Sequence, residues 1–281
     1  MAPIRSFKEY DLSAFDWDKT PVLGKGSHGK VFLGELDLGS VAIKVAPCRA
    51  ASSLVKEKAI LKQFIGCSKI VQYIGDTVTK KGDDVVYSLI LEYATGGTLG
   101  DIIRKQEKIS EEDAKKYLRM ILQGLSCIHA KGFVHADLKS DNILAFRSKS
   151  GRMKLKIADF GLSRMYDEKE EKSLCWNYYK MSFVGTAKYM SPESVFDIVK
   201  PALDIWSLGC IFVNMMTGRH VWNDCKDNKE LISKLIYERE IPTIPKELSE
   251  LGKDFLEKCF ERNYEKRWSA DMLLRHPYLG P

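Results

Sequence analysis

The chain has 281 residues, which exceeds the usual size of a single domain and predicts one large domain or two packed lobes. Its apolar fraction is 44%, and its net charge of +6 comes from basic residues scattered among acidic ones, which argues against binding nucleic acid or a membrane through bulk charge. Seven dispersed cysteines argue against a disulfide framework or a zinc knuckle. No apolar run reaches the roughly 18 residues of a membrane span, and the N-terminus lacks the apolar core of a signal peptide. We therefore expect a soluble cytoplasmic or nuclear protein.

The first hundred residues predict a β-sheet interrupted by one helix. Segments 22–36, 40–46 and 85–94 alternate or run apolar, are rich in β-branched residues, and are separated by Gly and Asp turns. Segment 51–64 instead places its apolar residues near helical spacing.

The remainder of the chain predicts helices. One over 111–132 carries a single apolar stripe and ends at Lys131-Gly132. Its stripe consists of Ala114, Leu118, Ile121, Leu122, Leu125 and Ile128. Segment 202–218 is apolar on nearly all faces and predicts a buried helix, and segments 247–260 and 269–276 predict amphipathic helices with a serine near each start.

This division predicts an α+β, two-lobed fold. We expect an N-terminal extension over 1–16, a strand-rich lobe and Gly-containing hinge over 17–97, and a helical lobe over 98–281. The long connection over 162–189 is expected to lack regular structure, and loops of that length in compact domains are usually functional.

A glycine-rich stretch, GKGSHGKV (24–31), lies within segment 22–36, where KVFLGEL is expected to be the return strand of a hairpin. Gly24, Gly26 and Gly29 would let the backbone fold closely over an anion, although a simple hairpin turn would have the same pattern. Lys44 follows on an apolar strand, and Glu57 on the next helix could pair with it. A lysine held by a carboxylate is a fixed positive charge for phosphate oxygens, whereas an edge-strand lysine would face solvent.

The segment HADLKSDN and the later ADFG supply carboxylates and an amide. Asp137 could accept or orient a proton of an attacking hydroxyl. Asn142 and Asp159 offer hard oxygen ligands that suit Mg²⁺, although each could also be a turn residue.

Together these motifs resemble the eukaryotic protein kinase family, from about Trp17 to Leu279. The matching pieces, in order, are GKGSHGKV, VAIK, Glu57, HADLKSDN, DFG, GTAKYMSPE (185–193), DIWSLGC (204–210) and Arg267. The resemblance implies a bilobal kinase fold with MgATP-dependent transfer to a protein, and Glu193 paired with Arg267 in the helical lobe.

The resemblance also implies roles for individual residues. Asp137 would be the catalytic base, and Lys139 would neutralise the transferring phosphoryl group, with Thr186 contacting both. Lys44 would bind phosphates while anchored by Glu57, under a cover formed by the three glycines, and Asn142 and Asp159 would hold Mg²⁺. The adenine would be bound by Leu23, Val31, Ala42, Leu144, the Leu91 gatekeeper, and backbone groups of Glu92 and Ala94.

Thr186 and the position of Lys139 favour serine/threonine over tyrosine phosphorylation. Within the family, GKGSHGKVFLG, FVGTAKYMSPE and TGRHVWND are most similar to plant mitogen-activated protein kinase kinase kinases of the short type. That resemblance implies that the protein substrate is a mitogen-activated protein kinase kinase, and separately we expect a monomer.

Ala136 departs from the family pattern, in which an arginine precedes the catalytic aspartate. That arginine pairs with a phosphate on the activation loop, so its loss removes a clamp and leaves Asp137 in place. We interpret Ala136 as a change of regulation. If the loop residues Ser173, Tyr178, Tyr179, Ser182 or Thr186 are phosphorylated, Arg164, Lys180 and Lys188 are the candidate basic partners.

Two alternatives remain open from the sequence. The first is a nucleotide-binding pseudokinase or scaffold with little transfer, which Ala136 alone supports. The second is a small-molecule phosphotransferase, which GTAKYMSPE disfavours because it matches the segment that docks protein substrates.

Overall fold

The computed structural model of the chain describes residues 10, 12, 15, 17, 19–26, 29–37, 39–81, 84–148, 151–166 and 185–280. The chain divides into two compact units. The N-terminal unit comprises Met1–Thr95 with Asp159–Gly161, and the C-terminal unit comprises Gly96–Ala158 with Leu162–Pro281. Across the described ranges, no helix combines the length and apolarity needed to cross a membrane.

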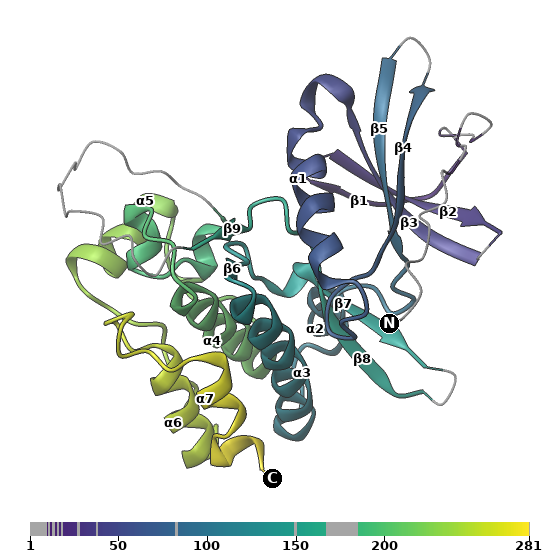
Figure 1. Cartoon of the computed structure of the whole chain (residues 1–281). Helices are drawn as coiled ribbons and strands as arrows, with labels where there is room; N and C mark the ends of the chain where they lie inside the picture. Colours follow the sequence, from purple (N-terminus) through teal and green to yellow (C-terminus); the bar gives the residue numbers. More distant parts are fainter. Residues whose placement is uncertain are drawn as a thin grey trace. The chain divides into compact units, whose positions relative to one another are not determined.

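The N-terminal unit is built on a five-stranded antiparallel sheet in the order β1-β2-β3-β5-β4 (Figure 1). Its strands are β1 (Val22–Gly26), β2 (Gly29–Leu36), β3 (Gly39–Pro47), β4 (Tyr73–Lys81) and β5 (Asp84–Glu92). The three predicted strand segments are confirmed. The sequence analysis missed β4, because Gly75, Asp76 and a run of Thr and Lys interrupt its apolar pattern.

Strand alternation separates two faces of this sheet. Phe32, Val41, Ile43 and Val45 pack with Trp17 in an apolar core on one face. Directly opposed residues of antiparallel strands share a face, so the pairs Val31 with Lys44 and Ala42 with Leu91 lie on the other. The register therefore gathers four predicted site residues on one face of the sheet.

Helix α1 (Ser52–Leu61) confirms the helix predicted over 51–64, and a 3₁₀ turn, Lys62–Phe64, continues it. Leu54, Ile60 and Leu61 are buried on this helix, and so is the charged Glu57. A carboxylate with no exposed surface requires a partner, which places Glu57 in the candidate site.

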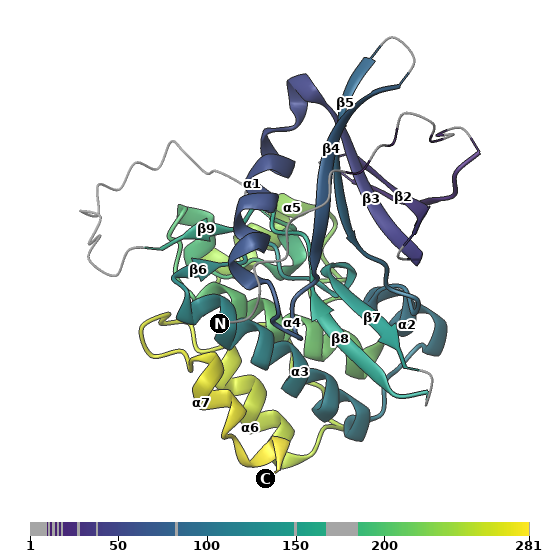
Figure 2. The same ribbon diagram turned by 45° about the vertical axis from the view of Figure 1, so that its right-hand side comes forward.

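The C-terminal unit is mainly helical, with α3, α4, α6 and α7 lying side by side in both views (Figures 1 and 2). Its helices are α2 (Leu99–Gln106), α3 (Glu111–Ala130), α4 (Ala202–Thr217), α5 (Asn228–Ile232), α6 (Glu250–Cys259) and α7 (Ala270–Leu274). All six predicted stripe residues of α3 are buried. Ser249 and Ser269 cap α6 and α7 by accepting backbone N–H groups, as predicted.

Helix α4 is buried along most of its length, as its apolar sequence predicts. It ends where Gly218 adopts a left-handed conformation with φ 71°. Helix α2 was not predicted, although Thr98 and Asp101 at its start form a capping box, which is a readable sequence signal.

Two short ribbons complete the C-terminal unit. Strand β6 (Phe133–Val134) pairs with β9 (Arg164–Met165), and β7 (Ile143–Arg147) pairs with β8 (Met153–Ile157). The expectation that 162–189 lacks regular structure is wrong at both ends, where β9 and a 3₁₀ turn, Ala187–Tyr189, are formed. Residues 167–184, including Ser173, Tyr178, Tyr179, Lys180 and Ser182, lie outside the described residues.

Candidate active site

In the N-terminal unit, Lys44 of β3 lies between two carboxylates. Its Nζ is 2.8 Å from Glu57 Oε2 and 2.8 Å from Asp159 Oδ1. Burial lowers the pKa of Lys44, but Glu57 and Asp159 together outweigh that effect and raise it, so the ammonium stays charged. The predicted pairing of Lys44 with Glu57 is confirmed, and Asp159 joins it.

The segment that carries Asp159 is attached to α1. The Phe160 N–H donates to Glu57 Oε1 over 3.3 Å, and the Phe160 ring stacks on Phe64 with centroids 5.8 Å apart. Asp159 itself has φ 65°, which a non-glycine residue adopts only when its surroundings impose it. The Glu57 carboxylate and the Asp159 carboxylate are therefore each held in a defined position beside Lys44.

The three predicted glycines, two in β1 and one at the start of β2, differ in what they require. A Cβ at Gly29, where φ is 127°, would lie 2.2 Å from Val45 O, so packing alone excludes a side chain there. At Gly24 and Gly26, no atom of the described residues lies within 4 Å of an added Cβ. Packing does not explain glycine at these two positions, whereas close approach of a ligand to the backbone would.

The remaining predicted adenine contacts of this unit differ in exposure. Leu23 is exposed, Val31 and Ala42 are half-buried, and Leu91 and Ala94 are buried. In Glu92, the backbone N–H donates to Gln72 O over 3.1 Å and the side chain accepts from the Gln72 N–H over 2.8 Å. The Glu92 N–H and carboxylate are thus both engaged with Gln72.

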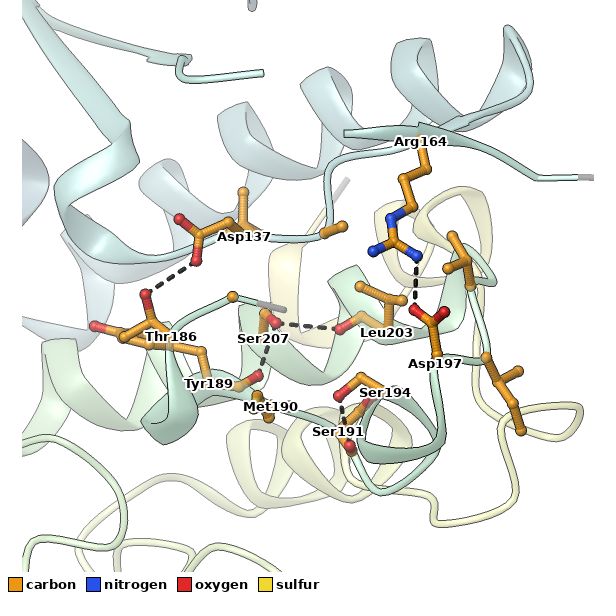
Figure 3. A pocket seen from close by; sticks show the side chains of 15 residues that line it. Asp137, Arg164, Thr186, Tyr189, Met190, Ser191, Ser194, Asp197, Leu203 and Ser207 are labelled. Atoms are coloured by element: carbon orange, nitrogen blue, oxygen red, sulfur yellow. Dashed lines mark hydrogen bonds and ion pairs between the residues drawn. The ribbon is translucent and has the colours of Figure 1, made fainter. Parts of the chain in front are cut away.

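In the C-terminal unit, Asp137, Lys139 and Thr186 form a closed triangle. Lys139 Nζ is 2.8 Å from Asp137 Oδ2 and 3.0 Å from Thr186 Oγ1. The Thr186 hydroxyl donates to Asp137 Oδ1 over 2.9 Å, which is the contact that Figure 3 shows. These residues come from positions up to 49 apart in the chain. The structure thus brings together the predicted base, lysine and threonine.

Asn142 completes this group. Its Nδ2 donates to the Asp137 backbone carbonyl over 2.8 Å and to Asp137 Oδ2 over 3.2 Å, which directs the hydrogen-bond donors of the amide toward Asp137. The amide acceptor, Oδ1, is left as an oxygen ligand of the kind that Mg²⁺ prefers. Leu144, two residues further, is half-buried at the start of β7.

A buried carboxylate on α4 holds the loop that carries Asp137. Asp204, with no exposed surface, accepts the backbone N–H of His135 over 2.8 Å and that of Ala136 over 3.0 Å. His129 Nε2 lies 2.9 Å from the same carboxylate. The sequence analysis assigned Asp204 no role, although an aspartate in an otherwise apolar helix was the available signal.

Ala136 adopts φ 64° and lines a small cavity of about 30 Å³, enough for about two water molecules. Arg164, Asp197 and Ser207 also line the cavity, and Figure 3 shows Arg164 directed at Asp197. Residue 136 therefore contributes no positive charge beside this cavity, whereas Arg164, which also lines it, does.

The predicted pair of Glu193 and Arg267 is confirmed and buried. Arg267 Nη2 is 3.0 Å from Glu193 Oε2, and the guanidinium also donates to the backbone carbonyls of Ala202 and Glu261, each over 2.8 Å. It lies over the Trp206 ring, 5.1 Å from the centroid. This ion pair holds the 3₁₀ turn Glu193–Phe196 in place.

Residues 17–279 match the family described as the protein kinase domain, and the chain belongs to that family. Its relatives include mitogen-activated protein kinase kinase kinases 20 and 17 of Arabidopsis thaliana, with 36% and 34% identity over 94% of this chain. The matches span 78% and 69% of those proteins. Mitogen-activated protein kinase kinase kinase A of Dictyostelium discoideum is 32% identical over 94% of this chain and 28% of its own length.

The class that fold and sequence define is therefore a serine/threonine protein kinase. Within that class, the chain groups with mitogen-activated protein kinase kinase kinases, including those of plants, as the sequence analysis predicted. Protein kinases in general use ATP and Mg²⁺ and act on proteins.

Proposed function

We propose that this kinase transfers the γ-phosphoryl group of MgATP to a serine or threonine hydroxyl of a mitogen-activated protein kinase kinase. The names of its relatives support a kinase as the substrate. The observation that carries the proposal is the triangle of Asp137, Lys139 and Thr186, which assembles a proton acceptor and a cation at one point.

Asp137 would orient the substrate hydroxyl and accept its proton as the oxygen attacks phosphorus. Lys139 would stabilise the negative charge on the transferring group, and its contact with Thr186 supports that position. Transfer would thus depend on positioning and electrostatic stabilisation, with no covalent enzyme intermediate.

Lys44 would bind phosphate oxygens of ATP, since its charge is maintained by Glu57 and Asp159. The open space above Gly24 and Gly26 supports a nucleotide phosphate approaching that backbone. The adenine would contact the apolar side chains and the backbone groups predicted for it, namely Leu23, Val31, Ala42, Leu91, Leu144, and the backbone of Glu92 and Ala94.

Asn142 and Asp159 would hold Mg²⁺, and their oxygen donors fit a hard cation. When bound, Mg²⁺ would neutralise charge on the phosphates. Asp159 contributes a carboxylate that already has a defined position beside Lys44, and Asn142 contributes Oδ1.

The alternative function is a nucleotide-binding scaffold without transfer, and Ala136 is the feature that favours it. However, the backbone at Ala136 is held by Asp204, and the Asp137 carboxylate keeps its three side-chain partners. The contacts of the groups proposed to carry out transfer are therefore made without an arginine at position 136, which supports the kinase over the scaffold.

The test is phosphoryl transfer from MgATP by the dephosphorylated chain to a mitogen-activated protein kinase kinase that cannot itself transfer phosphate. The proposal is supported if transfer is lost in the kinase variants Lys44→Met and Asp137→Asn. Transfer should also be lost when the activation-loop serines and threonines of the substrate are replaced by alanine. ATP binding without transfer would establish the scaffold. Transfer to a generic basic protein alone would contradict the proposed substrate.

A further inference from the structure

A second charged residue, Lys58, directly follows Glu57 on α1. Lys58 Nζ is 2.6 Å from Asp76 Oδ2 of β4, and both side chains are partly buried. Nothing in the proposed transfer reaction uses this pair, yet it links the helix that carries Glu57 to the sheet that carries Lys44.

Asp76 also accepts hydrogen bonds from two tyrosines. The Tyr87 hydroxyl of β5 donates to Asp76 Oδ2 over 3.0 Å, and the Tyr73 hydroxyl at the start of β4 donates to Oδ1. We refer to Lys58, Tyr73, Asp76 and Tyr87 as the Asp76 cluster. Lys62, just after α1, adds a second link, with Nζ 5.5 Å from the centroid of the Tyr73 ring.

The protonation states in the cluster support these contacts. Burial raises the pKa of Asp76, but hydrogen bonds from Lys58, Tyr73 and Tyr87 outweigh burial and lower it, so the carboxylate is ionised at neutral pH. Burial and the neighbouring Asp76 raise the pKa of both tyrosines, which therefore keep the protons that they donate.

The directions of Glu57 and Lys58 are coupled by helix geometry. Consecutive residues of an α-helix point about 100° apart, so a rotation of α1 that moves one side chain moves the other. The apolar contacts of Leu54, Ile60 and Leu61 hold the helix against its surroundings, but such contacts are non-directional. A hydrogen-bonded ion pair has a defined geometry and can set the rotation of the helix.

We propose that the Asp76 cluster is a positioning device for phosphoryl transfer, in which Lys58 and Asp76 fix the rotation of α1 and so hold Glu57 on Lys44. The inference rests on the proposed roles of Lys44 and Glu57. Neither Lys58 nor Asp76 would touch the substrate or the nucleotide.

The first test compares Lys58→Met with two matched variants at saturating MgATP. Lys58→Met should lower kcat by roughly tenfold, and Lys58→Arg should recover most of the loss because a guanidinium can still pair with Asp76. Lys56→Met removes the same charge from the exposed side of the same helix and should leave kcat unchanged. An unchanged kcat in Lys58→Met, or an equal loss in Lys56→Met, would overturn the proposal.

A second test separates positioning from general destabilisation. In a Glu57→Gln background, Lys58→Met and Asp76→Asn should have little further effect on kcat, because the contact that they support is already lost. If the fold-losses of kcat in the single variants multiply fully in the double variants, the proposal is overturned. This holds whatever the thermal unfolding midpoints of the variants are. If Lys44→Met and Glu57→Gln themselves retain full transfer, the proposed function of these residues fails first, which is a distinguishable result.

Discussion

Arg164 of β9 forms an ion pair with Asp197, with Arg164 Nη1 2.6 Å from Asp197 Oδ1. Both residues line the cavity beside Ala136. The sequence analysis offered Arg164 as a partner for a loop phosphate, but the structure gives this guanidinium a carboxylate from the same unit. The positive charge of Arg164 on β9 is therefore already neutralised by the Asp197 carboxylate.

We expect that Asp197→Asn lowers transfer by the dephosphorylated chain a few-fold. The substitution removes the ion pair that holds β9 in place, and β9 lies three residues after Gly161 in the segment that follows Asp159. Asparagine suits the test because it tolerates the left-handed backbone of Asp197, where φ is 57°. Steady-state transfer rates after phosphatase treatment give the measurement, and an Asp197→Asn rate equal to that of the unaltered chain would contradict it.

Thr186 provides a test of the Asp137–Lys139 geometry. Thr186→Ala removes one hydrogen bond to each partner and should lower kcat by roughly tenfold or more. Thr186→Ser keeps the hydroxyl and should retain most of the activity, which separates the hydrogen bond from the volume of the side chain. Equal losses in the two variants would show that the hydroxyl is not what matters.

The Glu193–Arg267 pair should contribute mainly to stability. Glu193→Gln leaves the Arg267 charge buried with weaker compensation, and we expect a loss of about 3–5 kcal/mol in the free energy of unfolding, as is usual when one partner of a buried ion pair is removed. Chemical denaturation measures this change. Glu250→Gln, at an exposed pair with Lys253, is the control and should change stability by less than about 1 kcal/mol.

Tyr189 should make stability sensitive to alkaline pH. Burial raises the pKa of its phenol to about 12, with hydrogen bonding to Ser140 acting in the opposite direction. A raised pKa means that the folded protein favours the neutral phenol, so this contribution is complete below pH 10 and is lost as the pH rises through about 12. The difference in unfolding free energy between the chain and Tyr189→Phe should shrink over this range, whereas parallel curves would contradict the assignment.

The sequence predicted the parts of the fold that local pattern determines. The stripe of α3, the buried α4 and the Lys44–Glu57 pair each follow from residue spacing or from a charge on an apolar strand. The strand β4 was missed because Asp76 and its polar neighbours hide the alternation, and the partners of Asp76, namely Lys58, Tyr73 and Tyr87, come together only when α1, β4 and β5 pack against one another. Asp204 and Asp197 were missed because their partners are 68 and 33 residues away.

The balance of charge beside Ala136 has an evolutionary consequence. An arginine at this position would adjoin a cavity that Arg164 already lines, and the carboxylates among the described residues that line it, Asp137 and Asp197, are already paired. A single codon change to arginine would thus add an uncompensated charge. A lineage that first gained another anion there, from a second carboxylate or a loop phosphate, would accept the arginine at a lower cost in stability, so this order of changes is favoured over the reverse.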